Sequence, residues 1–176
     1  MIDHSQVYLA DASNRVTGIQ RLLDEFDLHT EGTIALKANY NSDDPFPATT
    51  HPETLRILAE HLKMNSRDLI MAERNGMGAT QGFSQGGPDQ GTLIKPGLLY
   101  ASTDRVAMDA VGVALFRLYG TTPEVSRGRI FEQEQISHAA SLGIGVNSAE
   151  KIELVPLDES SQKAADSIHK VLDEQG

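Results

Sequence analysis

Residues 33–73, TIALKANYNSDDPFPATTHPETLRILAEHLKMNSRDLIMAE, decide the fold. Residues 33–36 form a short apolar run of the kind found in strands that are buried on both faces, and residues 68–73 form a second strand-like run. Between the two runs, apolar side chains recur with helical spacing at Leu55, Ile57, Leu58 and Leu62. A strand, a helix and a strand in this order predict a right-handed crossover between parallel strands.

The same alternation extends toward both ends of the chain. Residues 6–10 predict a first strand, and Ser13 or Asn14 is placed to cap the helix that follows. Residues 97–101 predict a further strand, and Ser102 or Thr103 is placed to cap a helix over about residues 104–119. We therefore predict an α/β fold, a single three-layer domain with a mostly parallel sheet that contains residues 33–36, 69–72 and 98–101 and is flanked by helices.

The C-terminal part completes this pattern. Residues 130–142 predict a helix that ends at Gly143, with Ile144 placed for the hydrophobic contact of a left-handed cap. A last strand at residues 152–155 and a terminal helix at residues 160–172 follow. The single domain spans residues 1–176 and divides into an N-terminal β–α half (1–78), a glycine-rich loop (79–96) and a C-terminal half (97–176).

Composition excludes several classes of function. The formal charge of −10, with fifteen scattered Lys and Arg residues, argues against a nucleic-acid partner. The sequence has no cysteine, so the chain alone forms no disulfide and supplies none of the usual ligands of an iron–sulfur cluster. It has no apolar run near twenty residues and no N-terminal basic segment followed by an apolar one, so we expect no membrane span and a cytoplasmic location.

The polar run after residue 36 is a candidate ligand site. Lys37, Asn39 and Asn41 stand at alternate positions, so their side chains point to one side if the strand continues that far. Thr50 and His51 open the next helix, whose first-turn N–H groups favour a carboxylate or phosphate. The alternative is a surface loop in which Asn residues make turns and Lys37 lies in solvent. Thr50 with Glu53 also fits a capping box, which is structural.

Two glycines and one glutamate extend this candidate site. Gly86 and Gly87 could present consecutive N–H groups to an anion. Glu73 ends a predicted strand and is either a metal ligand or general base, or the partner of Arg74 or Lys37 in a salt bridge.

Two further carboxylates belong to the helix predicted over about residues 104–119. Asp109 interrupts an apolar run in this helix, so we expect it to be buried and to need a partner. That partner is Arg105, a metal, or a hydrogen-bonded network that leads to the pocket. Asp104 either favours the helix dipole or, at the sheet edge where ligands bind, serves as a metal ligand.

Several blocks resemble the domain of unknown function family 362, which is often associated with iron–sulfur proteins. The blocks are residues 35–41, 48–53, 72–78, 86–88, 101–111 and 139–145, in the family's order. Members of the family carry a long middle section between the blocks at 72–78 and 86–88, so this chain is internally shortened. The resemblance implies a ligand- or metal-dependent role, but the absence of cysteine keeps the iron–sulfur association from being transferred.

Three functions stay open at this point. The chain is a small-molecule enzyme or metal-dependent redox accessory protein with a divalent metal as candidate cofactor, a noncatalytic module that binds a small anion, or a shortened remnant without activity. Whether it is an enzyme is not decided by the sequence. Removal of a middle section from an α/β domain exposes a sheet edge or a helix-packing face, so we also expect a homodimer.

Overall fold

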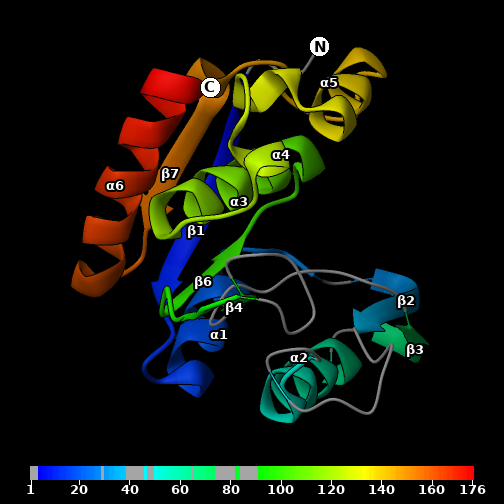
Figure 1. Cartoon of the computed structure of the whole chain (residues 1–176). Helices are drawn as coiled ribbons and strands as arrows, with labels where there is room; N and C mark the ends of the chain where they lie inside the picture. The colour runs from blue at the N-terminus through cyan, green and yellow to red at the C-terminus, as the bar shows by residue number, and fades with distance from the viewer. Residues whose placement is uncertain are drawn as a thin grey trace.

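The computed structural model describes residues 4–28, 30–38, 46, 50–64, 66–73, 82–83 and 91–176, which form a mixed arrangement of helices and strands (Figure 1). The strands are β1 (Ser5–Asp11), β2 (Thr30–Ala38), β3 (Ser66–Glu73), β4 (Gly82–Phe83), β5 (Leu93–Ile94), β6 (Leu98–Ala101) and β7 (Ile152–Pro156). The helices are α1 (Arg15–Asp24), α2 (Pro52–Met64), α3 (Arg105–Tyr119), α4 (Pro123–Ser126), α5 (Glu134–Ser141) and α6 (Glu159–Gln175), with short 3₁₀ turns at Ile130–Glu132 and Ala149–Lys151.

The centre of the molecule is a three-stranded sheet in the order β6-β1-β7. Strand β1 runs parallel to β7, with Val7 opposite Leu154, and antiparallel to β6, with Leu9 opposite Tyr100. The side chains of β1 alternate between two apolar clusters, as the pleat of a strand requires. Val7 and Leu9 belong to the cluster built with α3, α5 and α6, whereas Tyr8 and Ala10 belong to the cluster built with α1 and α2. Helices therefore cover both faces of this sheet.

Strands β2 and β3 form a separate two-stranded sheet, and β4 and β5 form another. The pairing of β2 with β3 is parallel, which confirms the crossover predicted from residues 33–73. Figure 1 shows both strands beside α2, away from β7 and α6. The prediction that β6 lies in one mostly parallel sheet with β2 and β3 was wrong for the described strands, because β6 pairs antiparallel with β1 instead.

The helix predicted over residues 130–142 is interrupted near its start. A 3₁₀ turn at Ile130–Glu132 precedes α5, and Gln133 between them has an extended ψ of 130°. The predicted helix stop at Gly143 is confirmed, whereas Ile144, expected to make a hydrophobic contact, is 46% exposed. Gly143 has a φ of +71°, and the N–H groups of Gly143 and Ile144 donate to the carbonyls of Ala140 and Ala139.

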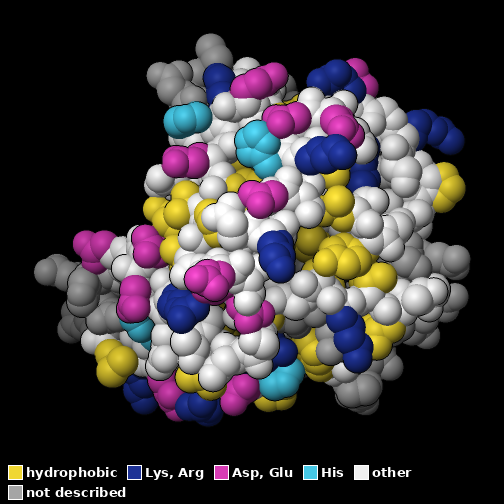
Figure 2. Space-filling model, turned by 90° about the vertical axis from the view of Figure 1, so that its left-hand side faces the viewer, with side chains coloured by type: hydrophobic (Ala, Val, Ile, Leu, Met, Phe, Trp, Pro, Cys, Tyr) yellow, Lys and Arg dark blue, Asp and Glu magenta, His cyan; other side chains and the backbone are white. Residues whose placement is uncertain are grey.

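The surface mixes charges of both signs. On the face shown in Figure 2, which includes α6, Lys and Arg side chains are interspersed with Asp and Glu rather than gathered into a continuous basic area. In the part of the chain that the structure describes, no helix is both long enough and apolar enough to span a bilayer.

Candidate functional site

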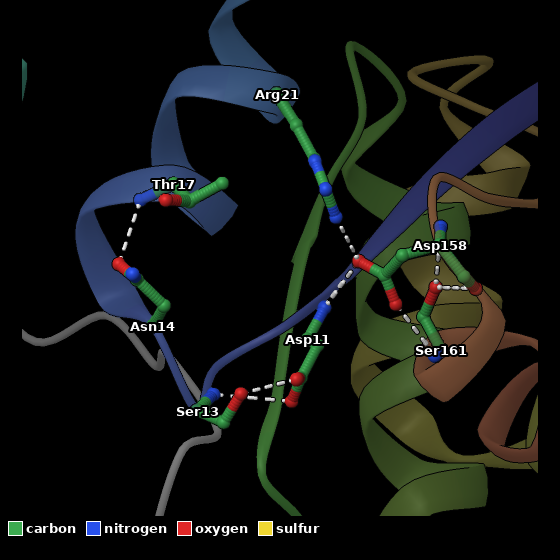
Figure 3. A network of polar contacts seen from close by, with 7 residues as sticks. All are labelled: Asp11, Ser13, Asn14, Thr17, Arg21, Asp158 and Ser161. Carbon is green, nitrogen blue, oxygen red and sulfur yellow. Dashed lines mark hydrogen bonds and ion pairs between the residues drawn. The ribbon is translucent and has the colours of Figure 1, made fainter.

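The carboxyl ends of the parallel strands β1 and β7 meet at one edge of the central sheet, where open α/β sheets commonly bind ligands. Asp158 lies at this edge and connects three elements (Figure 3). Its carboxylate accepts hydrogen bonds from the N–H of Asp11 at 2.9 Å and the N–H of Ser161 at 2.8 Å, and its Oδ2 lies 3.0 Å from Nη1 of Arg21. These bonds join the end of β1, helix α1 and the first turn of α6.

The polar groups of this edge already bond to one another. Burial raises the pKa of Asp158, but the N–H groups of Asp11 and Ser161, the Ser161 hydroxyl and Arg21 outweigh burial and hold that pKa below its usual value. The carboxylate of Asp11 accepts from the N–H and the hydroxyl of Ser13, and Asn14 caps α1 through the N–H of Thr17. This edge is therefore a capping network, which the spacing of Asp158 and Ser161 before an amphipathic helix could have indicated.

The start of α2 gathers a different set of groups. His51 is the N-cap of α2, because its carbonyl accepts from the N–H of Leu55 at 3.2 Å and its Nδ1 accepts from the N–H of Glu53 at 3.2 Å. The cap was predicted at Thr50, one residue earlier. A neutral imidazole that accepts at Nδ1 carries its proton on Nε2, so His51 keeps a donor near the helix N-terminus.

Arg15 reaches the same helix start from α1. Its Nη1 donates to Oγ1 of Thr54 at 3.3 Å, and its guanidinium lies 5.2 Å from the centre of the Phe46 ring. The ring of His51 meets Phe46 edge to face, with 5.0 Å between the ring centres. Burial lowers the pKa of Arg15, and the nearby carboxylate of Glu53 raises it. Sequence reasoning missed Arg15, since no pattern connects residue 15 to the loop before α2.

The predicted ligand residues fall partly outside the described residues. Asn39, Asn41, Gly86 and Gly87 lie there, so their predicted roles stay predictions. The backbone of Lys37 lies in β2 opposite Ala72, one position before the pair formed by Ala38 and Glu73, so Lys37 and Glu73 end the same parallel sheet. Thr50 is half-buried just before α2.

Asp104 is the buried carboxylate of α3, with 4% of its surface exposed. Its Oδ1 accepts from the N–H groups of Val106 and Ala107 at 2.9 and 3.0 Å, and its Oδ2 accepts from the N–H of Val146 at 2.9 Å. Asp104 is thus the N-cap of α3, a place that the sequence assigned to Ser102 or Thr103. Gly145 packs so closely that a Cβ there would overlap Oδ1 of Asp104.

Asp109 differs most from its prediction. It is exposed on α3, and among the ion pairs between described residues none joins it to Arg105. The helix packs through a broad face that includes Ala107, Ala110 and Val111, and Asp109 lies on the remaining strip. Partial burial still raises the pKa of Asp109. Its neighbour Tyr100 has a pKa raised to about 12, first by burial and then by the charge of Asp109.

The predicted site residues therefore do not form one pocket. Glu73 ends the sheet of β2 and β3, whereas Asp104 caps a helix that follows β6 in the central sheet. Asp104 and Asp109 are five residues apart on one helix and point to different sides of it. Within the described ranges, no three His, Asp or Glu side chains gather closely enough to hold a metal ion.

Comparison with known proteins identifies no relative. No family model, curated protein or solved structure matches this chain. The resemblance to the domain of unknown function family 362 stays a prediction, and function is inferred from geometry alone.

Proposed function

We propose that the protein is a noncatalytic module that binds a small anion, a phosphate or carboxylate, at the first turn of α2. The observation that carries the proposal is the reach of Arg15 from α1 to Thr54 in that turn. It adds a guanidinium to a helix N-terminus whose dipole already favours negative charge.

The donors at this turn suit an oxyanion. The contact with Thr54 uses one of the five N–H donors of the Arg15 guanidinium, whose planar fork matches the oxygens of phosphate or carboxylate. The Nε2–H of His51 adds a donor, because Nδ1 is occupied by the N–H of Glu53. Phe46 contacts both Arg15 and His51, which restricts the directions in which their polar groups point.

The residues predicted from the polar run extend this proposal. Lys37 lies near the end of β2, and we propose that Lys37, Asn39 and Asn41 complete the anion pocket with Thr50. Asp104 and Asp109 take no part in it, because one caps α3 and the other is exposed elsewhere on that helix.

We also propose that two copies of the chain associate. Within the described part, β2 and β3 pair only with each other, so each keeps a free edge there. Ile70 of β3 is 57% exposed and Met64 at the end of α2 is 78% exposed. A second copy that covers this small sheet would bury both side chains.

Titration of the full chain with inorganic phosphate by calorimetry tests the anion site. Arg15→Gln should weaken phosphate binding about tenfold or more, because a charge-assisted hydrogen bond contributes about 1.5–3 kcal/mol. Arg56→Gln is the matched control, since Arg56 lies on α2, the helix of the proposed site, and pairs with Glu60 at 2.7 Å. Equal binding by all three proteins would show that Arg15 does not contact the anion, and no binding by the wild type would contradict the proposal.

A further inference from the structure

Two opposite charges lie near each other at the start of α2 without forming an ion pair. The guanidinium of Arg15 comes from α1, Glu53 lies in the first turn of α2, and both residues are half-buried. Within the part of the chain that the structure describes, no ion pair joins the two. Their charges still interact, since burial lowers the pKa of Arg15 and the charge of Glu53 raises it. Each charge therefore remains available to a ligand.

Two other contacts set the position of the guanidinium. Nη1 of Arg15 donates to Oγ1 of Thr54 at 3.3 Å, and the guanidinium lies over the Phe46 ring, 5.2 Å from its centre. The face of an aromatic ring attracts a cation. The ring of Phe46 in turn meets His51 edge to face, with 5.0 Å between the ring centres. Thr54 and Phe46, rather than Glu53, thus hold the positive charge of Arg15 where it is.

The described charges of this site cancel. Arg15 carries one positive charge and Glu53 one negative charge, and His51 is neutral because its Nδ1 accepts from the N–H of Glu53 at 3.2 Å. A simple anion bound to Arg15 would lie near the negative charge of Glu53, in a protein whose net charge is already −10. A ligand that carries a positive charge of its own would offset this repulsion.

We propose that the ligand of the anion site is a small zwitterion, whose phosphate or carboxylate binds Arg15 and whose ammonium group binds Glu53. The inference rests on the proposed function, because it places the anionic group of the ligand at the same turn of α2. An ammonium group donates three hydrogen bonds, and a carboxylate accepts several. Glu53 thereby selects ligands in which a positive and a negative group lie a few bonds apart.

Two phosphate esters of equal length distinguish a zwitterion site from a simple anion site. Calorimetry of the full chain at matched ionic strength compares 3-aminopropyl phosphate, which carries an ammonium group, with butyl phosphate, which carries a methyl group in its place. The wild type should bind the aminopropyl ester about fivefold more tightly, as expected for a charged hydrogen bond at a half-buried carboxylate.

Replacement of Glu53 should reverse this preference. Glu53→Gln should weaken binding of the aminopropyl ester about fivefold and tighten binding of the butyl ester about threefold, because it removes a partner of the ammonium and a repulsion of the phosphate. Glu53→Asp keeps the charge and should retain the wild-type preference. Glu60→Gln removes the same charge from a residue of α2 that pairs with Arg56 at 2.7 Å, and it should change neither affinity.

The affinities of the variants also separate the zwitterion from the anion site itself. Tighter binding of both esters by Glu53→Gln would show that Glu53 only competes for Arg15, and it would overturn the zwitterion. Unchanged affinities in Glu53→Gln, or an equal change in Glu60→Gln, would overturn it as well. In each of these cases, wild-type binding of inorganic phosphate would leave the proposed function standing. Failure of the wild type to bind either ester or inorganic phosphate would contradict both.

Discussion

Asp104 shows how one side chain can satisfy several backbone groups. Its two oxygens accept three N–H groups from two separate segments, the first turn of α3 and Val146. Gly145 leaves the space that this contact needs, because any side chain there would overlap Asp104 and Val106. The carboxylate that the sequence offered as a metal ligand thus holds the start of α3 against the segment after α5.

Replacement of Asp104 measures this capping role. Asp104→Ala should lower the free energy of unfolding by about 2–5 kcal/mol, because it removes a helix cap and leaves buried N–H groups unpaired. Asp104→Asn keeps an acceptor and should cost less. Urea denaturation of the two variants checks both values, and an Asp104→Ala protein as stable as the wild type would refute the capping role.

Tyr100 supplies a test at high pH. Its pKa is raised to about 12 from an ordinary value of 10. The folded protein therefore binds more protons than the unfolded chain between pH 10 and 12, so stability present below pH 10 is lost as the pH rises through that window. The loss of stability attributable to this raised pKa is about 2–3 kcal/mol.

The titration of tyrosine absorbance follows this group directly. The alkaline step near pH 12 should disappear in Tyr100→Phe and move to lower pH in Asp109→Asn, because the charge of Asp109 contributes to the shift. A Tyr100→Phe variant that keeps the late step would show that another tyrosine is responsible.

At the scale of elements, Asp158 joins β1, α1 and α6 through one carboxylate that is only 12% exposed. Its folded-state pKa is lowered, so its contribution to stability is present above the unfolded pKa of about 3.9 and is lost as the pH falls through the folded value. Asp158→Ala should lower the free energy of unfolding at pH 7 by about 2–4 kcal/mol.

The acid side of the stability curve separates this role from simple packing. Wild type and Asp158→Ala should differ at pH 7 and converge below pH 4, because protonated Asp158 loses its ionic contacts. Thermal unfolding across this range measures the difference, and a constant gap at every pH would contradict it.

Local patterns predicted the elements well, and long-range pairing poorly. The strand at residues 33–36, the helix capped by Asn14 and the glycine stop at Gly143 all depend on neighbours a few residues away, and all three are confirmed. The partner of β6 depends on residues ninety positions earlier, which no local pattern encodes, so its antiparallel pairing with β1 was missed. Arg15 was missed for the same reason, since it meets Thr54 only in the folded chain.

The prediction that Asp109 is buried was wrong for a different reason. An apolar run in a helix indicates that most of its faces pack, but not which narrow strip is left free. In α3 that strip holds Asp109, while the carboxylate at the N-cap, Asp104, is the one that becomes buried.

At the scale of the whole molecule, the edges of β2 and β3 that no other described strand covers predict a dimer. Light scattering during size exclusion should give twice the mass of 19.1 kDa, and Ile70→Lys should return the protein to a monomer by placing a charge in the apolar contact. A wild-type monomer that persists at high micromolar concentration would contradict the prediction.

The central claim is that an anion binds at the first turn of α2. A titration of isotopically labelled protein with inorganic phosphate, followed by amide NMR, tests it most directly because it reports position as well as affinity. We predict saturable shifts at the amides of Glu53, Thr54 and Leu55, with those of Ile168 and Val171 in α6 unchanged, and loss of these shifts in Arg15→Gln. Shifts confined to the capping network around Asp158, or none at α2, would contradict the claim.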